Sequence, residues 1–522
     1  MSEAKIAIIG SGVAGASIAW ELVKMGHDVV IFEKGPAYPY PHSSQFHAVH
    51  ELLLPIEGQY DPPNDLKAHT FSGSWKKNLE SERFMRVGGA CTVWEALSPR
   101  MRPADFQRRS LLGFGDDWPI RYGDLEPFYC EAEELLGVAG SDEDNPFAPP
   151  RSKPFPLPPF ELSWDDLQLT QSLGKSGIVL HTTPQARTRQ EYDSRSQCVN
   201  LKTCKLCPIG ARYSPNHHLE RALATGRCEL RVETSIRRLV RSSSGRIESL
   251  IVRPNESARD EELPVDWVVL AAGTMESTRL LLLSADPRSP EGLGNDSGQV
   301  GHHLTFHHIW HGEHRFDAPL WPGRVGPWTG QCDQFLDPPP GSGHGGMKVE
   351  YSSRMAGGGG FRSNWQSAED VLASMRDLPF IRHIALHAET CGGPEKRLYL
   401  SDTKDRFSDA LTHVHYELSD FDFATFEAAR ALSRRFADAV GAEESFDEDP
   451  NLFRTAFHQM GSCRMGESTA DSVVDTFGKV HGVDNLFLAG SSIFRGSSGA
   501  VNPTLTIVAL ALRTADRLEA EL

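Results

Sequence analysis

The N-terminal segment "KIAIIGSGVAGASIAWELVKMGHDVVIFEKGP" has the hydrophobic pattern of a strand, a turn, a helix and a second strand. The apolar run at 6–9 is short and β-branched, which is typical of a parallel strand that is buried on both faces. Two further strands, within 266–284 and 485–494, end in small residues, and the first leads into a helical pattern. This pattern predicts an α/β domain whose strands come from both ends of the chain.

A different pattern occupies 311–449. The segments "MKVEYSS", "IRHIALHAET", "KRLYLSD" and "THVHYELS" alternate or cluster their apolar residues as antiparallel strands do. The later segment "DFATFEAARALSRRFADAV" has the spacing of a long amphipathic helix. We expect an antiparallel-sheet α+β substrate-binding domain here. A connecting segment at 161–194 would join it to a discontinuous α/β domain built from 1–160, 195–310 and 450–522.

The first predicted turn carries a dinucleotide-binding motif of the Rossmann type. Gly10, Gly12 and Gly15 form G-x-G-x-x-G between the strand and the helix. These glycines allow a tight turn, a close approach of the backbone to a pyrophosphate, and close packing of helix on strand. Glu33 ends the second strand, where a carboxylate can hold a ribose hydroxyl. Several strand ends of small residues suit a long cofactor lying across the sheet, which favours FAD over NAD.

Charge and cysteine content narrow the class of protein. The chain of 522 residues has 53 Lys and Arg against 70 Asp and Glu, a formal net charge of -17. Nucleic acid is excluded as a partner because phosphate binding needs a basic surface, whereas a cationic protein partner would suit this balance. The sequence has no apolar run of the length of a membrane span and no basic region before the first strand. Its nine cysteines do not form a disulfide framework, so we expect a reducing, cytoplasmic location.

Several motifs follow one another in the order seen in a known family. They are the N-terminal glycines, "RVGGACTVWEALSPRM" at 86–101, "LAAGTMES", "HQMGSCRMG" at 458–466 and "NPTLT" at 502–506. Over nearly the whole chain they resemble the glucose–methanol–choline (GMC) family of FAD oxidoreductases. "GDDWPIRYGDLEPFY" and "CPIGARY" are similar to the catalytic subunits of bacterial FAD-dependent glucose and gluconate dehydrogenases. Pyranose oxidases are the next relatives that the sequence resembles.

The resemblance implies oxidation of a CH–OH group of a sugar or sugar-like alcohol, with hydride transfer to flavin N5. His458 matches the family's histidine base, and Asn502 matches its partner, which hydrogen-bonds the alcohol oxygen. An imidazole suits this role because it titrates near neutral pH and hydride leaves only as the oxygen loses its proton. Val93 stands where pyranose oxidases carry a flavin-linking histidine, so we expect noncovalent FAD.

The last helix is predicted to begin with Asn502 as N-cap and Pro503 at the first helical position. Its positive N-terminal end would favour negative charge on a reduced flavin. We further expect a polar pocket lined by the histidines of "VGHHLTFHH", which are His302, His303, His307 and His308, and a flexible turn at 357–360. The residues expected at FAD are Gly10, Ser11, Gly12, Val13, Ala14, Gly15, Glu33, Lys34, Gly88, Gly89, Val93, Trp94, Ile236, Ala272, Gly273, Glu276, Gly490, Ser491, Asn502, Pro503 and Thr504.

Cys198, Cys204 and Cys207 have the spacing C-x5-C-x2-C, and three interpretations stay open. In the resembled dehydrogenases a three-cysteine segment holds a three-iron [3Fe-4S] cluster, although this chain has one residue fewer between the second and third cysteines. Such a cluster could accept electrons one at a time and pass them outward. The second interpretation is a structural loop with free thiols. The third is a zinc site completed by His217 and His218.

These interpretations imply different partners. With an iron–sulfur cluster, we expect a small subunit and a cytochrome-type electron acceptor, and export to the periplasm with a signal-bearing partner becomes the alternative location. Without a cluster, we expect a sugar or alcohol oxidase, or a biosynthetic alcohol oxidase, that uses dioxygen. An electron-transfer or lyase-type protein that keeps FAD without net oxidation is disfavoured, because both His458 and Asn502 are present.

Overall fold

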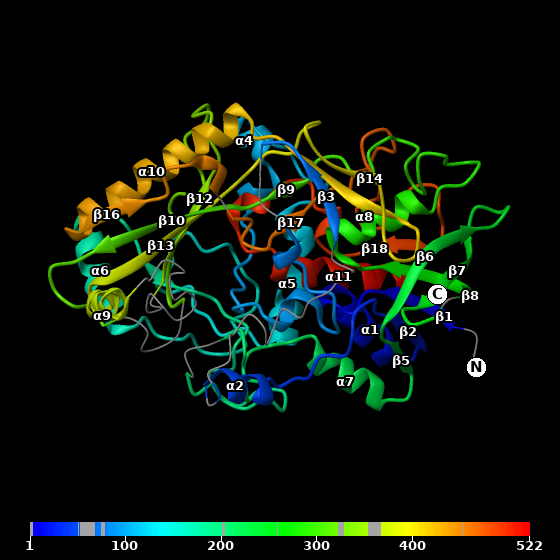
Figure 1. Ribbon diagram of the computed structural model, residues 1–522, viewed down its shortest axis with the longest axis horizontal. Coiled ribbons are helices and arrows are strands. Elements are labelled where there is room, and N and C mark those ends of the chain that lie inside the picture. The colour runs from blue at the N-terminus through cyan, green and yellow to red at the C-terminus, as the bar shows by residue number, and fades with distance from the viewer. Residues whose placement is uncertain are drawn as a thin grey trace.

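The strands form two main sheets at opposite ends of the molecule, and both chain termini lie beside the same sheet (Figure 1). The computed structural model describes residues 4–50, 52, 68–74, 79–200, 204–257, 259–321, 328–352, 367–452 and 454–522. The glycine run predicted as a turn at 357–360 lies outside the described residues. The mixed α/β class predicted from the sequence is confirmed.

The first sheet has a parallel centre with an antiparallel edge, in the order β5-β2-β1-β8-β7-β6, and β18 also pairs with β8. β1 pairs in parallel with both β2 and β8, as buried β-branched strands do. The antiparallel edge is the pair of strands β6 and β7. The strands are β1 (Ala4–Ile9), β2 (Val29–Phe32), β5 (Cys228–Arg231), β6 (Thr234–Arg241), β7 (Ile247–Pro254), β8 (Glu261–Leu270) and β18 (Leu486–Leu488).

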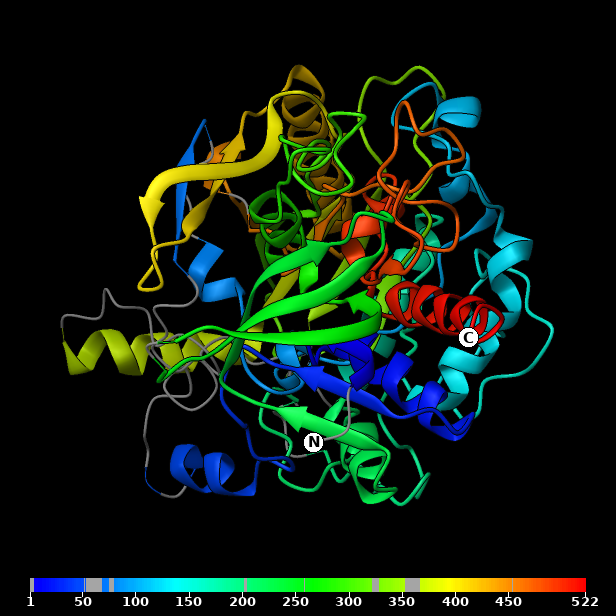
Figure 2. The ribbon, with the colours of Figure 1, turned by 90° about the vertical axis from the view of Figure 1, so that its right-hand side faces the viewer.

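Helices from distant parts of the chain pack together beside this sheet. The C-terminal helix α11 (Thr504–Glu519) lies against both α1 (Val13–Lys24) and α5 (Tyr122–Leu136), as Figure 2 shows. α1 also contacts α7 (Asn216–Ala224), and α8 (Gly273–Leu283) follows β8 directly. The N- and C-terminal segments therefore contribute strands to the same sheet and helices that pack beside it.

The second sheet is antiparallel, in the order β16-β10-β13-β12-β11-β4. One face packs its apolar side chains, including Trp310, Val349 and Leu386, into a core with α10 (Asp420–Val440). Ser419 caps this helix with a capping box formed with Asp422. The strands are β4 (His181–Thr182), β10 (His308–Arg315), β11 (Gly330–Cys332), β12 (Met347–Ser352), β13 (Ile381–Ala388) and β16 (Glu443–Phe446), with helices α6 (Trp164–Lys175) and α9 (Ala368–Asp377).

Some segments pair differently from what their pattern alone indicated. The predicted strands β14 (Lys396–Lys404) and β15 (Ala410–Tyr416) form a separate sheet with β3 (His69–Ser72), which runs parallel to β15. β4 lies in the predicted connecting segment and forms an edge of the second sheet. A short pair joins β9 (Thr305–Phe306) to β17 (Gln459–Met460).

The remaining helices are short. Two are α-helical, α2 (Ser43–His50) and α4 (Arg108–Leu112). The others are 3-10 helices at Leu79–Glu82, Gly89–Thr92, Pro103–Phe106, Leu378–Phe380, Pro450–Leu452, Ser491–Ile493 and Ser498–Ala500.

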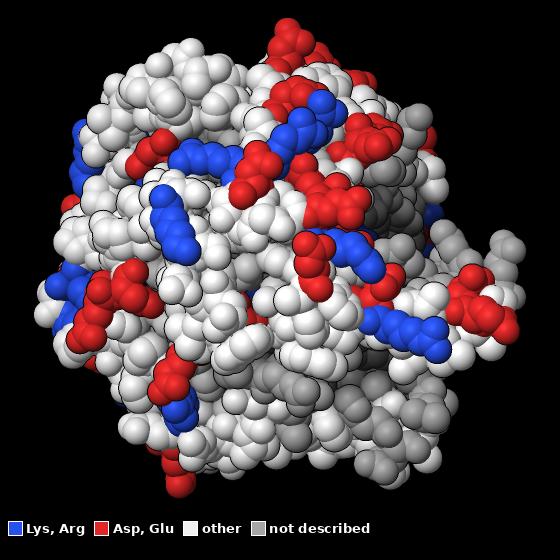
Figure 3. All heavy atoms as spheres, turned by 90° about the vertical axis from the view of Figure 1, so that its left-hand side faces the viewer, with Lys and Arg blue, Asp and Glu red and all other residues white. Residues whose placement is uncertain are grey.

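The face of the molecule at the second-sheet end carries charges of both signs. Figure 3 shows acidic and basic side chains interspersed there, with broad uncharged areas between them. The net negative charge is therefore not gathered into one acidic field on this face, which gives no support to a cationic protein partner docking there. No helix in the part of the chain that the structure describes is both long and apolar enough to cross a membrane.

Candidate active site

The glycine loop between β1 and α1 has the geometry that its motif predicts. Gly10 has a φ of +103°, and a Cβ on Gly15 would lie 2.0 Å from the Gly10 carbonyl oxygen, so both positions require glycine. A Cβ on Gly12, by contrast, would meet no atom within 4 Å. Gly12 is the N-cap of α1 and supplies no side-chain cap, so no side chain at this position competes for the first N–H groups of the helix. This arrangement suits a pyrophosphate.

Glu33 closes the loop from the end of β2. Its Oε2 accepts hydrogen bonds from the Ser11 backbone at 3.1 Å and from the Ser11 hydroxyl at 2.6 Å, and its Oε1 accepts one from Gly35 at 2.9 Å. Burial raises the pKa of Glu33, while these hydrogen bonds oppose the shift. The carboxyl group is therefore fixed beside the glycine loop, where the motif places a ribose-binding acid.

Other segments predicted at FAD approach the same loop or open toward empty space. A Cβ on Gly89 would lie 3.3 Å from the Gly12 Cα, so the Gly88–Gly89 backbone passes directly against the loop. Added Cβ atoms on Gly273 and Gly490 would meet nothing within 4 Å. Backbone that faces open space at strand ends and helix starts fits an elongated cofactor, and these residues would hold FAD.

Two of the residues predicted to contact FAD form an ion pair with each other. Lys34 and Glu276 form a partly buried ion pair at 3.1 Å, and Arg83 lies 2.5 Å from the same carboxylate. Burial alone would raise the pKa of Glu276, but Lys34 and Arg83 outweigh it and hold that pKa well below its usual value. This cluster stabilises the start of α8. Ile236 lies two residues after Thr234, whose N–H donates to the Glu33 carbonyl at 2.9 Å.

The remaining predicted FAD residues border the same region. Val13, Ala14 and Gly15 open α1, and Ala272 is the N-cap of α8. The Trp94 indole, next to Val93, donates to the Tyr213 carbonyl at 2.8 Å. The Ser491 carbonyl accepts from the Gly461 N–H at 2.9 Å, which ties the end of β18 to the segment that follows β17.

The strand pair β9–β17 brings His458 beside His307. Gln459 pairs with Phe306, so the two histidines come next in the antiparallel register. Their Nδ1 atoms are 2.9 Å apart, and the Nε2 of His307 bonds the Ser497 carbonyl. Ala456 and Phe457 have φ values of +49° and +63°, which are uncommon for residues other than glycine. Strained backbone of this kind clusters at functional sites.

Burial sets the charge state of these imidazoles. It holds the pKa of His458 well below its usual value, and the neighbouring His307 and His387 lower that pKa further. Burial also lowers the pKa of His307 to about 3. Both imidazoles are therefore neutral at neutral pH, and a neutral imidazole can accept a proton.

The Asn502 side chain joins a row of charged and polar side chains on the second sheet. The Lys348 ammonium donates to the Asn502 Oδ1 and to Glu350, and His387 Nε2 lies 3.0 Å from the other Glu350 oxygen. The His387 ring centroid is 6.0 Å from that of His458. Lys348, Glu350 and His387 are all less than 5% exposed. The predicted base and the predicted oxygen-binding amide therefore border one buried polar network.

The first helical residue of α11 is Thr504, and Pro503 is the N-cap. The expectation of Asn502 as N-cap and Pro503 at the first position was therefore wrong by one residue. The physical reason is that the Asn502 side chain bonds Lys348 instead of the helix N–H groups.

Sequence reasoning missed Lys348, Glu350 and His387. The signal that could have found them was the polar residues at every second position in "MKVEYSS" and the His in "IRHIALHAET". One face of each strand is apolar and packs into the core. Polar residues on the opposite face therefore indicate that this face borders a polar site. The His387 Nδ1 has no hydrogen-bond partner among the described residues, which suits a polar ligand.

Of the four histidines predicted to line a polar pocket, the structure places only His307 in this network. His308 points to the opposite side, where its Nε2 lies 3.0 Å from the Tyr416 hydroxyl. His303 has a φ of +60°, and burial lowers its pKa to about 4. The His302 ring is tilted by 52° relative to that of His303, with ring centroids 6.5 Å apart.

The described residues show no tight cluster of the three cysteine sulfurs. Cys204 and Cys207 are buried and Cys198 is half-buried, but their sulfurs are not a group within 4.8 Å of one another among the described residues. Residues 201–203 between them lie outside that part of the chain. Burial raises the pKa of the Cys204 thiol, which Arg187 opposes from 3.6 Å.

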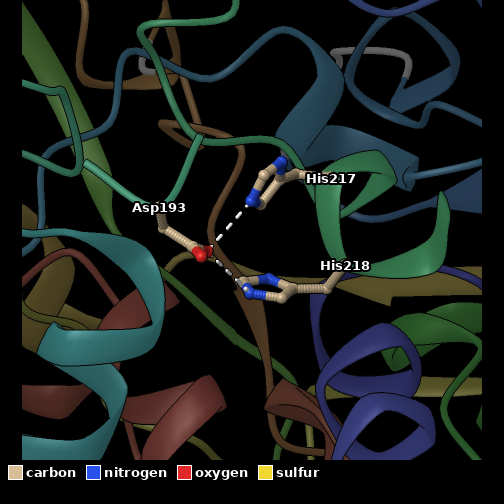
Figure 4. A group of neighbouring side chains, drawn as sticks. All are labelled: Asp193, His217 and His218. Atoms are coloured by element: carbon tan, nitrogen blue, oxygen red, sulfur yellow. Dashed lines mark hydrogen bonds and ion pairs between the residues drawn. The ribbon is translucent and has the colours of Figure 1, made fainter. Parts of the chain in front are cut away.

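The imidazoles considered for a zinc site bond a carboxylate instead. His217 Nε2 lies 3.0 Å and His218 Nε2 3.6 Å from the Asp193 Oδ2 (Figure 4). Arg221 contacts both oxygens of this carboxylate at 2.6 and 2.7 Å. The carboxylate is thus satisfied by protein donors, and nothing in this geometry supports zinc held by thiols and imidazoles together.

Three buried arginines flank the cysteine segment along the chain, and one of them, Arg187, contacts the Cys204 thiol. Arg187, Arg195 and Arg212 are at most 3% exposed, and each has at least one guanidinium nitrogen without a hydrogen-bond partner in the described part of the chain. Arg195 and Arg212 donate to backbone carbonyls. Buried cations normally need a negative partner, so this segment provides an electropositive environment.

Two family models match the chain. The GMC oxidoreductase model matches residues 394–511 and the FAD-dependent oxidoreductase model matches residues 5–116. These segments contain both the Glu33 loop and the His458 and Asn502 motifs.

Curated relatives cover the full length. The fructose dehydrogenase large subunit of Gluconobacter japonicus is 28% identical over 99% of this chain and 97% of its own. The 2-methyl-1,2-propanediol dehydrogenase of Mycolicibacterium austroafricanum is 28% identical over 98% and 94%. The paromamine 6'-oxidase of Streptomyces fradiae is 27% identical over 99% and 91%. Pyridoxine 4-oxidase from Mesorbium loti shares the fold, with a TM-score of 0.65 over 99% of both chains at 16% identity.

Proposed function

We propose that this chain, which matches a GMC oxidoreductase model and an FAD-dependent oxidoreductase model, is an FAD-dependent GMC oxidoreductase that oxidises a CH–OH group of a sugar or sugar-like alcohol. The observation that carries this proposal is the pairing of His458 with His307 beside the buried Lys348 network that holds Asn502. Relatives named for fructose, gluconate, an aminoglycoside and a diol support a polyhydroxylated substrate class.

His458 would take the hydroxyl proton of the substrate while Asn502 holds the same oxygen by a hydrogen bond. His458 is suited to this because it is neutral at neutral pH and only half-buried. The neighbouring His307, His387 and Lys348 are buried, so the protein holds these groups in fixed positions around His458. FAD, held noncovalently by the glycine loop, supplies the acceptor for the hydride.

The test is flavin bleaching by candidate sugars and polyols under anaerobic conditions. His458→Ala should abolish bleaching while the FAD content stays that of the unaltered protein. His302→Ala is the matched control, because His302 has no bond to this network, and it should bleach normally. Undiminished bleaching by the His458→Ala protein would refute the assignment.

We also propose that the cysteine segment holds an iron–sulfur cluster. The buried Arg187 guanidinium, 3.6 Å from the Cys204 thiol, fits a negatively charged group, since thiolates bind iron and a cluster carries net negative charge. When bound, a cluster supplies single-electron transfer. Cys198, Cys204 and Cys207 would be its ligands, and a small subunit with a cytochrome-type acceptor would be the partner.

The test is to measure iron and acid-labile sulfide per FAD and to record an EPR spectrum of the oxidised protein. These measurements distinguish an enzyme that passes electrons through a cluster to a partner protein from one that uses dioxygen. About three irons per FAD, lost in Cys204→Ser, support the cluster and an exported complex. Protein purified anaerobically with FAD and no iron supports structural thiols. In that case the enzyme is a dioxygen-using oxidase of a sugar or alcohol, a function favoured by the relative named as a paromamine oxidase, and we place it in the cytoplasm.

A further inference from the structure

We propose that His307 and Lys348 are positioning residues that decide which atoms of His458 and Asn502 face the substrate. His307 fixes the tautomer of His458 so that its Nε2 is free of hydrogen, and Lys348 fixes the Asn502 amide so that its Nδ2 is the group offered to the substrate oxygen. The inference rests on the proposed roles of His458 and Asn502. It adds the hydrogen positions on which both roles depend.

The tautomer follows from a chain of three polar groups. The Ser497 carbonyl can only accept a hydrogen bond, so the His307 Nε2 that contacts it must carry a hydrogen. His307 is neutral, because burial lowers its pKa to about 3, and a neutral imidazole has one N–H. Its Nδ1 is therefore an acceptor.

The acceptor state of the His307 Nδ1 determines which nitrogen of His458 carries the hydrogen. Its Nδ1 lies 2.9 Å from the His307 Nδ1 and must be the donor of that hydrogen bond. A neutral His458 has no second hydrogen, so its Nε2 keeps a free lone pair. The opposite tautomer would present an N–H to the substrate hydroxyl and could not remove its proton.

The hydrogen bond also favours the protonated state that the reaction forms. When Nε2 takes the hydroxyl proton, the imidazolium still donates its Nδ1–H to His307, and hydrogen bonds from a charged donor are stronger than neutral ones. The O–H electron pair becomes the carbonyl bond as the carbon loses hydride to the FAD that the proposed function requires. The groups that face His458 from the neighbouring strands are His307, His387 and Lys348, with Glu350 behind the last two.

Asn502 is oriented by the chemistry of the ammonium group. Lys348 has donors only, so the Asn502 atom that it contacts must be the carbonyl Oδ1. The amide nitrogen then points away from Lys348, and within the described part of the chain the Asn502 side chain makes no other hydrogen bond. Two N–H donors remain for the substrate oxygen. Glu350 balances the charge of Lys348, so the ammonium can stay buried at this position.

Two substitutions of His307 separate positioning from packing. His307→Gln can accept from His458 and donate to the Ser497 carbonyl, whereas His307→Leu can do neither. At saturating substrate, we expect the rate of flavin reduction to fall about 100-fold in the Leu variant and less than about 10-fold in the Gln variant. The substrate concentration for half-maximal rate should change little in either, because the lost contact is not made to the substrate.

The tautomer of His458 can be measured directly by NMR, without substrate turnover. In protein with 15N-labelled histidine, the His458 resonances, assigned by their absence in His458→Ala, should show a protonated Nδ1 and an unprotonated Nε2. In the His307→Leu variant, the tautomer equilibrium of His458 should shift toward the form with a protonated Nε2. A protonated Nε2 in the unaltered protein, or full activity of the Leu variant, overturns the inference for His307. If His458→Ala still bleaches flavin, the proposed function fails instead.

Lys348→Met tests the amide orientation, and Lys396→Met is its matched control. Lys396 is a second buried lysine, paired with Asp422 at 2.6 Å, and it makes no contact with Asn502. We expect both variants to lose thermal stability, but only Lys348→Met to lose about 10-fold or more in the rate of flavin reduction. Lys348→Arg, which keeps a donor, should recover part of the rate. Equal rates in Lys348→Met and Lys396→Met would overturn this part of the inference.

Discussion

Replacing Glu350 by Gln should destabilise the protein because it removes the only negative charge that Lys348 contacts in the described network. The Glu350 side chain is 3% exposed and touches both Lys348 and His387. Burial alone would raise the pKa of Glu350, but His387 and Lys348 outweigh it and lower that pKa from 4.5 to about 2. The folded state therefore binds the ionised form of Glu350 more favourably than the unfolded state does.

The size of the effect follows from that pKa difference. At about 1.4 kcal/mol for each pH unit, a shift from 4.5 to about 2 corresponds to about 3 kcal/mol of stability at pH 7. Removing one partner of a buried ion pair costs about 3–5 kcal/mol, which agrees. For a carboxyl group with a lowered pKa, this contribution is complete above pH 4.5 and is lost as the pH falls toward 2. At pH 3.5 the Glu350→Gln cost should shrink to about 2 kcal/mol.

Urea unfolding of the FAD-loaded protein, followed by tryptophan fluorescence at both pH values, measures this cost. Glu395→Gln is the control, because Glu395 also pairs with a histidine at 3.0 Å but is 67% exposed. It should change the free energy of unfolding by less than about 0.5 kcal/mol. Combining Glu350→Gln with Lys348→Met should recover part of the loss. A cost below about 1 kcal/mol at pH 7, or one that grows at low pH, would refute the charge assignment.

Three further outcomes follow from the cofactor loop and the core. Gly15→Ala places a methyl group 2.0 Å from the Gly10 carbonyl oxygen, so FAD binding should weaken at least about tenfold. Gly174→Ala is the control: its methyl group would meet no atom within 4 Å, and this variant should bind FAD normally. Glu33→Gln keeps the shape but removes the carboxylate, and FAD titration of the apoprotein should show about tenfold weaker binding. Leu386→Ala, at 0% exposure, should cost about 2–5 kcal/mol in urea unfolding.

Local features of the site were predictable from the sequence. The glycine loop and Glu33 lie within 24 residues of one another, and the strand–turn–helix pattern fixes their geometry through backbone constraints alone. The strands in "MKVEYSS" and "IRHIALHAET" were also predicted correctly and are β12 and β13. The roles of His458 and Asn502 stay predictions.

The pairing of strands was not predictable in the same way. The strands in "KRLYLSD" and "THVHYELS" join β3, a strand more than 320 residues earlier, instead of the second sheet. Alternation of polar and apolar residues shows that a segment is a strand, but it does not choose a partner. The partner depends on which apolar faces meet in the core.

The sequence alone determined the dinucleotide-binding type of the first strand, turn and helix, because glycine spacing and buried strands are properties of contiguous residues. Only the tertiary structure decided which side chains surround His458 and Asn502. Cross-strand register places Lys348 opposite His387, and burial of Val349 and Leu386 on the other face fixes that register. The polar network therefore depends on contacts between separate segments, with His307 and His458 151 residues apart and Lys348 and Asn502 154 apart, which no local pattern contains.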